Sequence, residues 1–313
     1  MGTPQFAVES LDILIKNNFN VVGVVTAPDK PAGRGQQLHQ SAVKKFAIEN
    51  NLKLLQPEKL KDENFITELA ALKADLQIVV AFRMLPEVVW NMPKMGTYNL
   101  HASLLPKYRG AAPINRAIIN GENETGVTTF KLKHEVDTGN ILFQEKVKID
   151  ENDCAGDLHD KLMLVGARLI LKTVKEIEKD YKGEKPVNFI HQNNSEASHA
   201  PKIFKEDCKI NWNNPVAEIH NLVRGLSPQP TAFCEIINGN SPVQNLKIFK
   251  TKIEVLNHPN TNGLLSTDNS TYLKVYCTGG AIEIAELQLE GKKRMAVKEF
   301  LRGYKIKSGA RLI

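Results

Sequence analysis

The N-terminal half of the chain alternates helix-like and strand-like patterns, and this alternation constrains the fold more than any other feature. Residues 6–16, 40–50 and 64–72 have apolar positions at helical spacing. Between them, residues 21–26 and 76–81 form short apolar runs rich in valine. Such runs are typical of parallel strands that helices cover on both faces. The pattern therefore predicts an α/β fold with a doubly wound, mostly parallel, Rossmann-like sheet.

The chain begins with Met1-Gly2-Thr3-Pro4 and passes straight into the first predicted helix. In a doubly wound sheet a strand normally stands before that helix. The sequence therefore predicts a sheet that lacks its first central strand.

At 313 residues the chain exceeds one typical domain, so two domains are expected. Residues 180–205 are polar and rich in turn formers, which is typical of a linker. Beyond them, short β-rich runs at 232–237, 246–255, 273–277 and 282–289 are separated by Gly, Pro and Asn. These runs predict a small β-barrel. We expect an N-terminal domain at residues 1–182, a linker at 183–205 and a barrel domain at 206–313.

The composition excludes several classes of protein. No run of 18 apolar residues and no signal-peptide pattern is present, so a cytoplasmic protein without membrane contact is expected. The four cysteines are scattered without ligand spacing, which predicts neither a metal site nor disulfides. The formal charge is +6, and residues 206–313 carry 14 Lys and Arg against 10 Asp and Glu. This basic excess fits either nucleic-acid binding or an ordinary solvated surface.

Polar side chains that suit acid–base chemistry follow two of the predicted strands. Asn99 and His101 lie where the strand at 96–100 gives way to a loop, and Asp137 follows the apolar alternating run at 126–132. Open α/β sheets bind ligands at such strand ends. His101 suits proton transfer near neutral pH, Asp137 could fix its tautomer, and Asn99 could donate an N–H to an oxyanion. Together they suit acyl transfer without a covalent intermediate.

Each of these groups also has a purely structural interpretation. A histidine at a strand end can simply be hydrogen-bonded, and Asp137-Thr-Gly139 and Arg109-Gly110 can be turns. Ser103 lacks the G-x-S-x-G elbow, which disfavours serine catalysis. Spacing alone leaves open whether Asn99, His101 and Asp137 meet.

Residues 28–38, P-D-K-P-A-G-R-G-Q-Q-L, are rich in turn formers and cations. The G-x-G within them has no third glycine at the spacing of a dinucleotide-binding fingerprint. Two interpretations remain: a flexible surface loop, or a loop that grips a polyanion with Lys30 and Arg34.

The stretch from Asn99 to Pro113, N-L-H-A-S-L-L-P-K-Y-R-G-A-A-P, with D-T-G at 137–139, resembles the signature of the formyltransferases that use 10-formyltetrahydrofolate. The similarity runs almost end to end. It includes G-T-P-x-F-A at 2–7, K-P-A-G-R-G at 30–35, A-F-R-M-L-P at 81–86, A-P-K-I at 200–203, G-L-S-P-x-P at 225–230 and G-K-K-R-M at 291–295. The triplet specifies only formyl-folate chemistry, whereas the loop at 30–35 and the C-terminal half are similar to the members that formylate methionyl-tRNA.

The resemblance implies formyl transfer from 10-formyltetrahydrofolate to the α-amino group of initiator methionyl-tRNA, for translation initiation, by a monomer with an OB-like C-terminal barrel. It implies that Asn99, His101 and Asp137 are catalytic. For folate binding it implies Phe82, Arg83, Met84, Leu85, Pro86, Ser103, Leu104, Leu105, Pro106, His134, Glu135 and Val136. For tRNA binding it implies Lys30, Arg34, Lys202, Lys292, Lys293 and Arg294.

Two other functions remain open. A related folate-dependent enzyme acting on a small-molecule amine, or on water, would share the triplet, but it would need neither the segment at 28–38 nor a basic C-terminal half. A non-catalytic tRNA- or RNA-binding protein is the other alternative, and the presence of all three polar groups argues against it.

Overall fold

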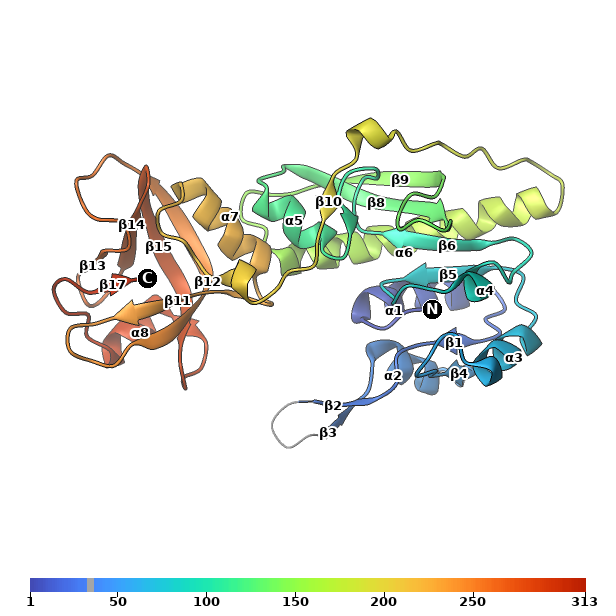
Figure 1. Ribbon diagram of the computed structural model, residues 1–313, viewed down its shortest axis with the longest axis horizontal. Helices are drawn as coiled ribbons and strands as arrows, with labels where there is room; N and C mark the ends of the chain where they lie inside the picture. Colours follow the sequence, from blue (N-terminus) through green and yellow to red (C-terminus); the bar gives the residue numbers. More distant parts are fainter. Residues whose placement is uncertain (33–36) are drawn as a thin grey trace. The chain divides into compact units, whose positions relative to one another are not determined.

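The computed structural model describes residues 1–32 and 37–313 and forms two compact units (Figure 1). Unit 1 comprises Met1–Gly110, Thr125–Lys148 and His159–His199, and unit 2 comprises Ala111–Glu124, Ile149–Leu158 and Ala200–Ile313. Residues 111–124 and 149–158 thus belong to the same unit as the C-terminal residues, although both precede residue 182. The boundaries at residues 182 and 206, drawn from the sequence, remain predictions.

Unit 1 has the Rossmann-like character that the sequence predicts, with parallel strands and intervening helices. β1 (Val24–Val25) pairs in parallel with β4 (Leu54–Leu55), and β5 (Gln77–Val80) pairs in parallel with β6 (Thr97–His101). Next in the sheet comes β8 (Glu124–Lys131), antiparallel to β6, and then β9 (Ile141–Lys148). The helices are α1 (Gln5–Lys16), α2 (Ala42–Glu49), α3 (Glu63–Ala71), α4 (Glu87–Trp90) and α6 (Ala155–Tyr181).

Met1 and Gly2 lie between β1 and β5, where the sequence predicts a missing strand. The Gly2 N–H donates to the Val25 carbonyl at 3.0 Å, and the Val80 N–H donates to the Met1 carbonyl at 2.9 Å. Gly2 also forms a parallel bridge with Val80. Two residues therefore connect the β1–β4 pair to the four-stranded sheet, in the place of a full central strand.

Residues 28–38, where one interpretation of the sequence is a flexible loop, include two short strands. β2 (Lys30–Ala32) pairs antiparallel with β3 (Gln37–His39), and Lys30 stands opposite His39. The backbone pairing of these strands is not visible in the composition, which indicates turn formers only. Arg34 lies outside the described residues.

β6 presents its side chains alternately to the two faces of the sheet. On one face, Tyr98 packs in a cluster with Ile177 of α6, and the Leu100 side chain lies directly against the same helix. α6 runs along this face of the sheet (Figure 1). Asn99 and His101 therefore point to the opposite face, which α6 leaves open.

Unit 2 contains a nearly closed antiparallel β-barrel, which confirms the barrel prediction. Its strands, in sheet order, are β13 (Leu265–Thr267), β14 (Leu273–Cys277), β15 (Gly280–Leu289), β12 (Gln244–Val255), β11 (Ala232–Ile237) and β17 (Arg311–Leu312), and β16 (Met295–Ala296) pairs with β15. The two ends of this order meet, because Leu264 forms an antiparallel bridge with Arg311. Closure of this kind removes exposed strand edges.

Alternate residues of the barrel strands fill its interior. Along β11, Ala232, Cys234 and Ile236 are buried while their neighbours are partly exposed, which is the period of two that a one-sided strand requires. Helix α7 (Val216–Leu226) contributes Ile219 and Val223 to the same core. The remaining elements are α5 (Pro113–Ile119), α8 (Val297–Gly303), β7 (Arg109–Gly110), β10 (His199–Ala200) and the 3-10 turns η1 (Asn194–Glu196) and η2 (Glu206–Cys208). Within residues 1–32 and 37–313, no helix is long and apolar enough to span a membrane.

Candidate active site at the ends of β6 and β8

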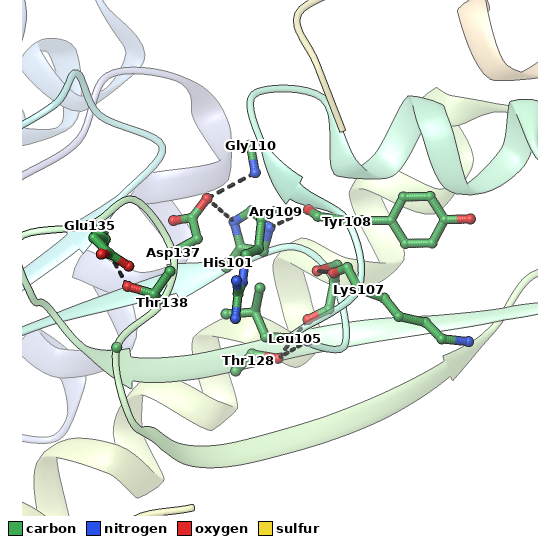
Figure 2. Close-up of polar contacts among 12 residues, drawn as sticks. His101, Leu105, Lys107, Tyr108, Arg109, Gly110, Thr128, Glu135, Asp137 and Thr138 are labelled. Atoms are coloured by element: carbon green, nitrogen blue, oxygen red, sulfur yellow. Dashed lines mark hydrogen bonds and ion pairs between the residues drawn. The ribbon is translucent and has the colours of Figure 1, made fainter. Parts of the chain in front are cut away.

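His101 ends β6 with a buried ring whose two nitrogens face different partners (Figure 2). Its Nε2 lies 2.8 Å from the carbonyl oxygen of Tyr108. Because a carbonyl oxygen only accepts hydrogen bonds, Nε2 carries the hydrogen, and the neutral ring then has its lone pair on Nδ1. The free position of this imidazole is therefore Nδ1.

Asp137 faces that second nitrogen. Its Oδ2 lies 3.8 Å from His101 Nδ1, which is an ion-pair distance and too long for a hydrogen bond. The same oxygen accepts the Gly110 N–H at 2.9 Å (Figure 2). The sequence suggests Asp137 as the group that fixes the imidazole tautomer, but in the structure the Tyr108 carbonyl holds the ring hydrogen. Asp137 instead places its carboxylate beside the lone pair of His101 Nδ1.

Asn99 lies two residues before His101 and on the same face of β6. It is half-buried and stands in register with Phe130 of β8. Its side chain makes no hydrogen bond to any residue in the described part of the chain, so the amide remains available to a ligand. The structure therefore places His101 and Asp137 in contact and Asn99 on the strand face beside them.

Both groups that face His101 stand on left-handed backbone. The φ angle is 60° at Tyr108 and 55° at Asp137. Residues other than glycine rarely adopt such angles, which cost about 1–3 kcal/mol each and concentrate at functional sites. The surroundings of His101 are thus held in place at a conformational cost.

Thr128 of β8 holds the loop that follows His101 (Figure 2). Its hydroxyl donates to the Ser103 carbonyl at 2.6 Å and accepts N–H groups of Leu105 at 3.1 Å and Gln144 at 3.0 Å. These three bonds use the full capacity of a hydroxyl, and Thr128 is fully buried. Sequence reasoning missed Thr128 and Gln144. The sequence carries no signal that singles out Thr128, because β8 also contains Thr125 and Thr129.

The residues implied for folate binding differ in exposure. Met84 and Val136 are 77% and 53% exposed, which is unusual for large apolar side chains. Also exposed are Arg83, His134 and Glu135, whereas Phe82, Pro86, Leu104 and Pro106 are half-buried. Ser103, Leu85 and Leu105 are buried. The Ser103 hydroxyl donates to the Lys107 carbonyl at 2.6 Å, so it shapes the loop rather than facing solvent.

Arg83 is already engaged by its own unit. Its guanidinium lies 5.5 Å from the centre of the Phe82 ring and donates to the carbonyls of Pro57 and Glu58, the latter at 2.7 Å. These contacts fix the loop after β5 against the segment that precedes α3.

A polar hollow of about 470 Å³ lies beside the Asp137 loop. Its walls come from that loop and from the segment that the sequence indicates as a linker. The lining residues are Lys133, His134, Glu135, Thr138, His191, Gln192 and Asn194. Of these, only His134 and Glu135 are among the predicted site residues. The three from residues 191–194 were missed because a polar stretch with several asparagines resembles any exposed connection.

The residues implied for tRNA binding lie in both units. Lys30 is exposed on β2 in unit 1, and Lys202, Lys292 and Lys293 are exposed in unit 2. Lys202 Nζ lies 5.4 Å from the centre of the Phe204 ring. Arg294 is paired with Glu286 and stacks over the Phe249 ring at 4.4 Å, so its charge is already partly neutralised.

Metal-ligating residues do not cluster in the described residues: no group of three or more His, Cys, Asp or Glu side chains could hold an ion. The cysteines there form no disulfide, and burial raises the pKa of Cys277 to about 11. That thiol is therefore protonated at neutral pH and serves the barrel core.

Two family models cover most of the chain. Residues 1–174 match the formyl transferase model, and residues 202–305 match the C-terminal domain model of the formyl transferases. The chain is 51% identical to the methionyl-tRNA formyltransferase of Bacteroides thetaiotaomicron, covering 100% of this chain and 97% of the relative. It is 54% identical to the corresponding enzyme of Phocaeicola vulgatus, covering 97% and 94%.

Solved structures share the fold at lower identity. A sugar 3N-formyl transferase, WlaRD, solved with dTDP and 5-N-formyl-THF, is 25% identical with a TM-score of 0.65, covering 93% of this chain and 97% of that one. An N-formyltransferase from Helicobacter canadensis, 24% identical with a TM-score of 0.63, covers 94% and 97% and shows the fold alone.

Proposed function

The chain belongs to the formyl transferase family, and we propose that it transfers a formyl group from 10-formyltetrahydrofolate to the α-amino group of initiator methionyl-tRNA. The product serves translation initiation in the cytoplasm, and the enzyme acts as a monomer. The observation that carries the proposal is the contact of His101 with Asp137 beside the unengaged amide of Asn99. Full-length similarity to methionyl-tRNA formyltransferases supports the choice of acceptor.

His101 moves the proton in this reaction, through Nδ1. An α-amine has a pKa of about 8, so much of it is protonated at neutral pH and must lose a proton before it attacks. The protonated amine first releases one proton to solvent. Nε2–H stays with the Tyr108 carbonyl, so the Nδ1 lone pair accepts the second proton as the neutral amine forms its bond to the formyl carbon. Asp137 at 3.8 Å then balances the charge of the imidazolium. The imidazolium returns a proton to the nitrogen that leaves the formyl carbon, so the reaction is balanced without any other co-reactant.

Asn99 stabilises the oxygen of the formyl group as it gains negative charge. Its amide N–H donors are not used by any described residue, so they can turn to that oxygen without breaking an existing bond. Donors aimed at a developing oxyanion are among the largest contributions to catalysis. Once it is protonated, His101 adds a positive charge to the stabilisation of that oxygen.

The formyl donor fits the exposed apolar residues of unit 1. Met84, which follows β5, and Val136, which precedes Asp137, offer apolar surface to a flat pterin ring, and neighbouring backbone groups can bind its polar edge. Buried Ser103 and Leu105 shape the loop that follows His101. The other members of the implied folate set complete the wall of this site.

The tRNA is bound through cations of both units, of which Lys30, Lys202, Lys292 and Lys293 are exposed. Lys30 and Arg34 contact the acceptor end, and Lys202, Lys292 and Lys293 contact phosphates with unit 2. We assign Arg294 a weaker part, because Glu286 already shares its charge. Phosphate contacts of this kind make binding strongly salt-dependent.

An acceptor comparison tests the function. Labelled formyl is supplied on 10-formyltetrahydrofolate to the full chain with initiator methionyl-tRNA, elongator methionyl-tRNA or an amino-sugar nucleotide. We expect label on the initiator tRNA alone. Label on the amino sugar, or lost to water, would keep the chemistry and overturn the acceptor, and no transfer by folded protein would overturn the enzyme assignment.

A further inference from the structure

Gln192 contacts the Asp137 loop from a segment that the sequence indicates as a linker. Its Nε2 donates to the carbonyl of Asp137 at 2.8 Å and to that of Gly139 at 2.7 Å. These two carbonyls flank Thr138, at the tip of the loop that carries the Asp137 carboxylate toward His101. One side-chain amide therefore holds both ends of a three-residue turn.

Arg109 fixes the orientation of that amide. Its Nε and Nη2 donate to Gln192 Oε1 at 3.1 Å and 2.7 Å. Since a guanidinium only donates, Oε1 must face Arg109, and Nε2 must face the two carbonyls. All four hydrogen-bonding positions of the amide are thus used, and the side chain is half-buried between exposed neighbours.

The contacts form a closed ring around the carboxylate. Gly110, the residue after Arg109, donates its N–H to Asp137 Oδ2 at 2.9 Å. Asp137 is therefore held at its carboxylate by Gly110 and at its backbone by Gln192, and Arg109 links the two. A loop on left-handed backbone needs such support, because its φ of 55° is not a preferred conformation.

The same segment also holds the second partner of His101. The Tyr108 N–H donates to Ser198 Oγ at 2.9 Å, and the Tyr108 carbonyl accepts from His101 Nε2. The Arg109 N–H donates to the Ser198 carbonyl at 2.9 Å. Gln192 and Ser198 thus reach, from one stretch of chain, the two groups that face the two ring nitrogens.

We propose that Gln192, oriented by Arg109, is a positioning residue that sets the distance between the Asp137 carboxylate and His101, so that Gln192 and Ser198, but not the exposed residues between them, belong to the active site. This proposal rests on the proposed function in one respect: its kinetic test measures formyl transfer. Misplacing a catalytic group by about 1 Å costs about 100-fold in rate, so Gln192→Ala is expected to lower kcat by about 10- to 100-fold with little change in KM for the tRNA.

Gln192→Glu is the sharper variant. It keeps the size of the side chain and its contact with Arg109, but it replaces both donors with an oxygen that repels the carbonyls of Asp137 and Gly139. We expect a fall in kcat at least as large as for Gln192→Ala, with only a small fall in the unfolding temperature. Glu196→Gln, an exposed change in the same segment, is the matched control and should behave as the unaltered protein.

A second readout does not depend on turnover. The ¹⁵N chemical shifts of the His101 ring, assigned by their loss in His101→Gln, report the tautomer and the charge nearby. We expect them to move in Gln192→Glu and to stay fixed in Glu196→Gln. Unchanged ring shifts, with kcat unchanged or falling only in step with the folded fraction, would overturn the proposal. If the unaltered protein fails to formylate methionyl-tRNA, the proposed function fails, and the ring shifts alone still decide the role of Gln192.

Discussion

At the scale of the residue, the function of the site depends on which partner each nitrogen of His101 faces. His101 has one nitrogen bound to a backbone carbonyl and the other beside a carboxylate, so the two nitrogens have different tasks. Nε2 orients the ring, and Nδ1 exchanges the proton. In the proposed mechanism, Asp137 balances the charge of the protonated ring, and Asn99 donates to the developing oxyanion.

Asn99→Ala removes one donor to the developing oxyanion. Loss of such a donor costs about 10²–10³ in kcat, with little change in either KM, because the donor acts mainly on the transition state. Steady-state kinetics with initiator methionyl-tRNA measures this split. Asn17→Ala, whose side chain only bonds the Ile13 carbonyl at the end of α1, is the control. A variant of Asn99 with raised KM and unchanged kcat would contradict the assigned role.

His220 gives unit 2 a predictable response to acid. Burial, with the nearby charge of Arg224, lowers the pKa of His220 from its ordinary value of 6.5 to about 4. Below pH 6.5 the unfolded chain takes up the proton first, so stability should fall as the pH falls from about 6.5 to about 4 and should be unaffected by this group at higher pH. The expected loss is about 1–3 kcal/mol.

His220→Asn tests that expectation. Asparagine can keep the hydrogen bond to Thr251 Oγ1, which His220 Nδ1 makes at 2.8 Å, but it does not titrate. Denaturant unfolding at a series of pH values should show a shallower decline for the variant between pH 6.5 and 4. If the free energy of unfolding falls equally with pH in the two proteins, His220 is not the source of the decline.

At the scale of the element, the site is made by β6, β8 and the connections that leave them. Alternation along β6 predicts from sequence that Asn99 and His101 share a face, and the family signature identifies Asp137. Three features are not predictable in the same way. The Tyr108 carbonyl and the Gly110 N–H are backbone groups, which every residue has, and Gln192 acts through a segment whose composition indicates only a polar connection. The main elements agree with the sequence within a few residues, whereas short strands such as β2 have too few residues to show a period.

Thr128→Val tests the link between β8 and the loop after His101. It leaves the buried Ser103 carbonyl and Leu105 N–H without their partner, at an expected cost of about 2–4 kcal/mol. Because that loop belongs to the implied folate site, folate affinity should also fall.

Thr129→Val is the matched control for this prediction. Thr129 is equally buried but faces α6, where its hydroxyl bonds Thr173 at 2.8 Å. Loss of this hydrogen bond should lower the free energy of unfolding by about 1–2 kcal/mol and leave folate affinity unchanged. Equal effects of the two valines on folate binding would mean that the loss is a general one of stability.

At the scale of the whole molecule, the proposed function needs formyl chemistry in unit 1 and cations in both units. The pair Lys292→Ala and Lys293→Ala removes two exposed charges from unit 2. The slope of log KM for tRNA against log salt should fall in magnitude by about 1–2, with the KM for folate unchanged. Lys182→Ala, whose partner is Glu178 on α6, is the control. An unchanged slope would exclude Lys292 and Lys293 from the tRNA interface.

The most direct test of the central claim is single-turnover formylation of initiator methionyl-tRNA by the unaltered protein and by His101→Ala. The account predicts efficient transfer by the first and a loss of about 10²–10⁴ in rate for the second, with folate binding and the unfolding temperature nearly unchanged. A folded His101→Ala protein that transfers formyl at a near-normal rate would contradict the account, because no other described group stands in its place between Tyr108 and Asp137.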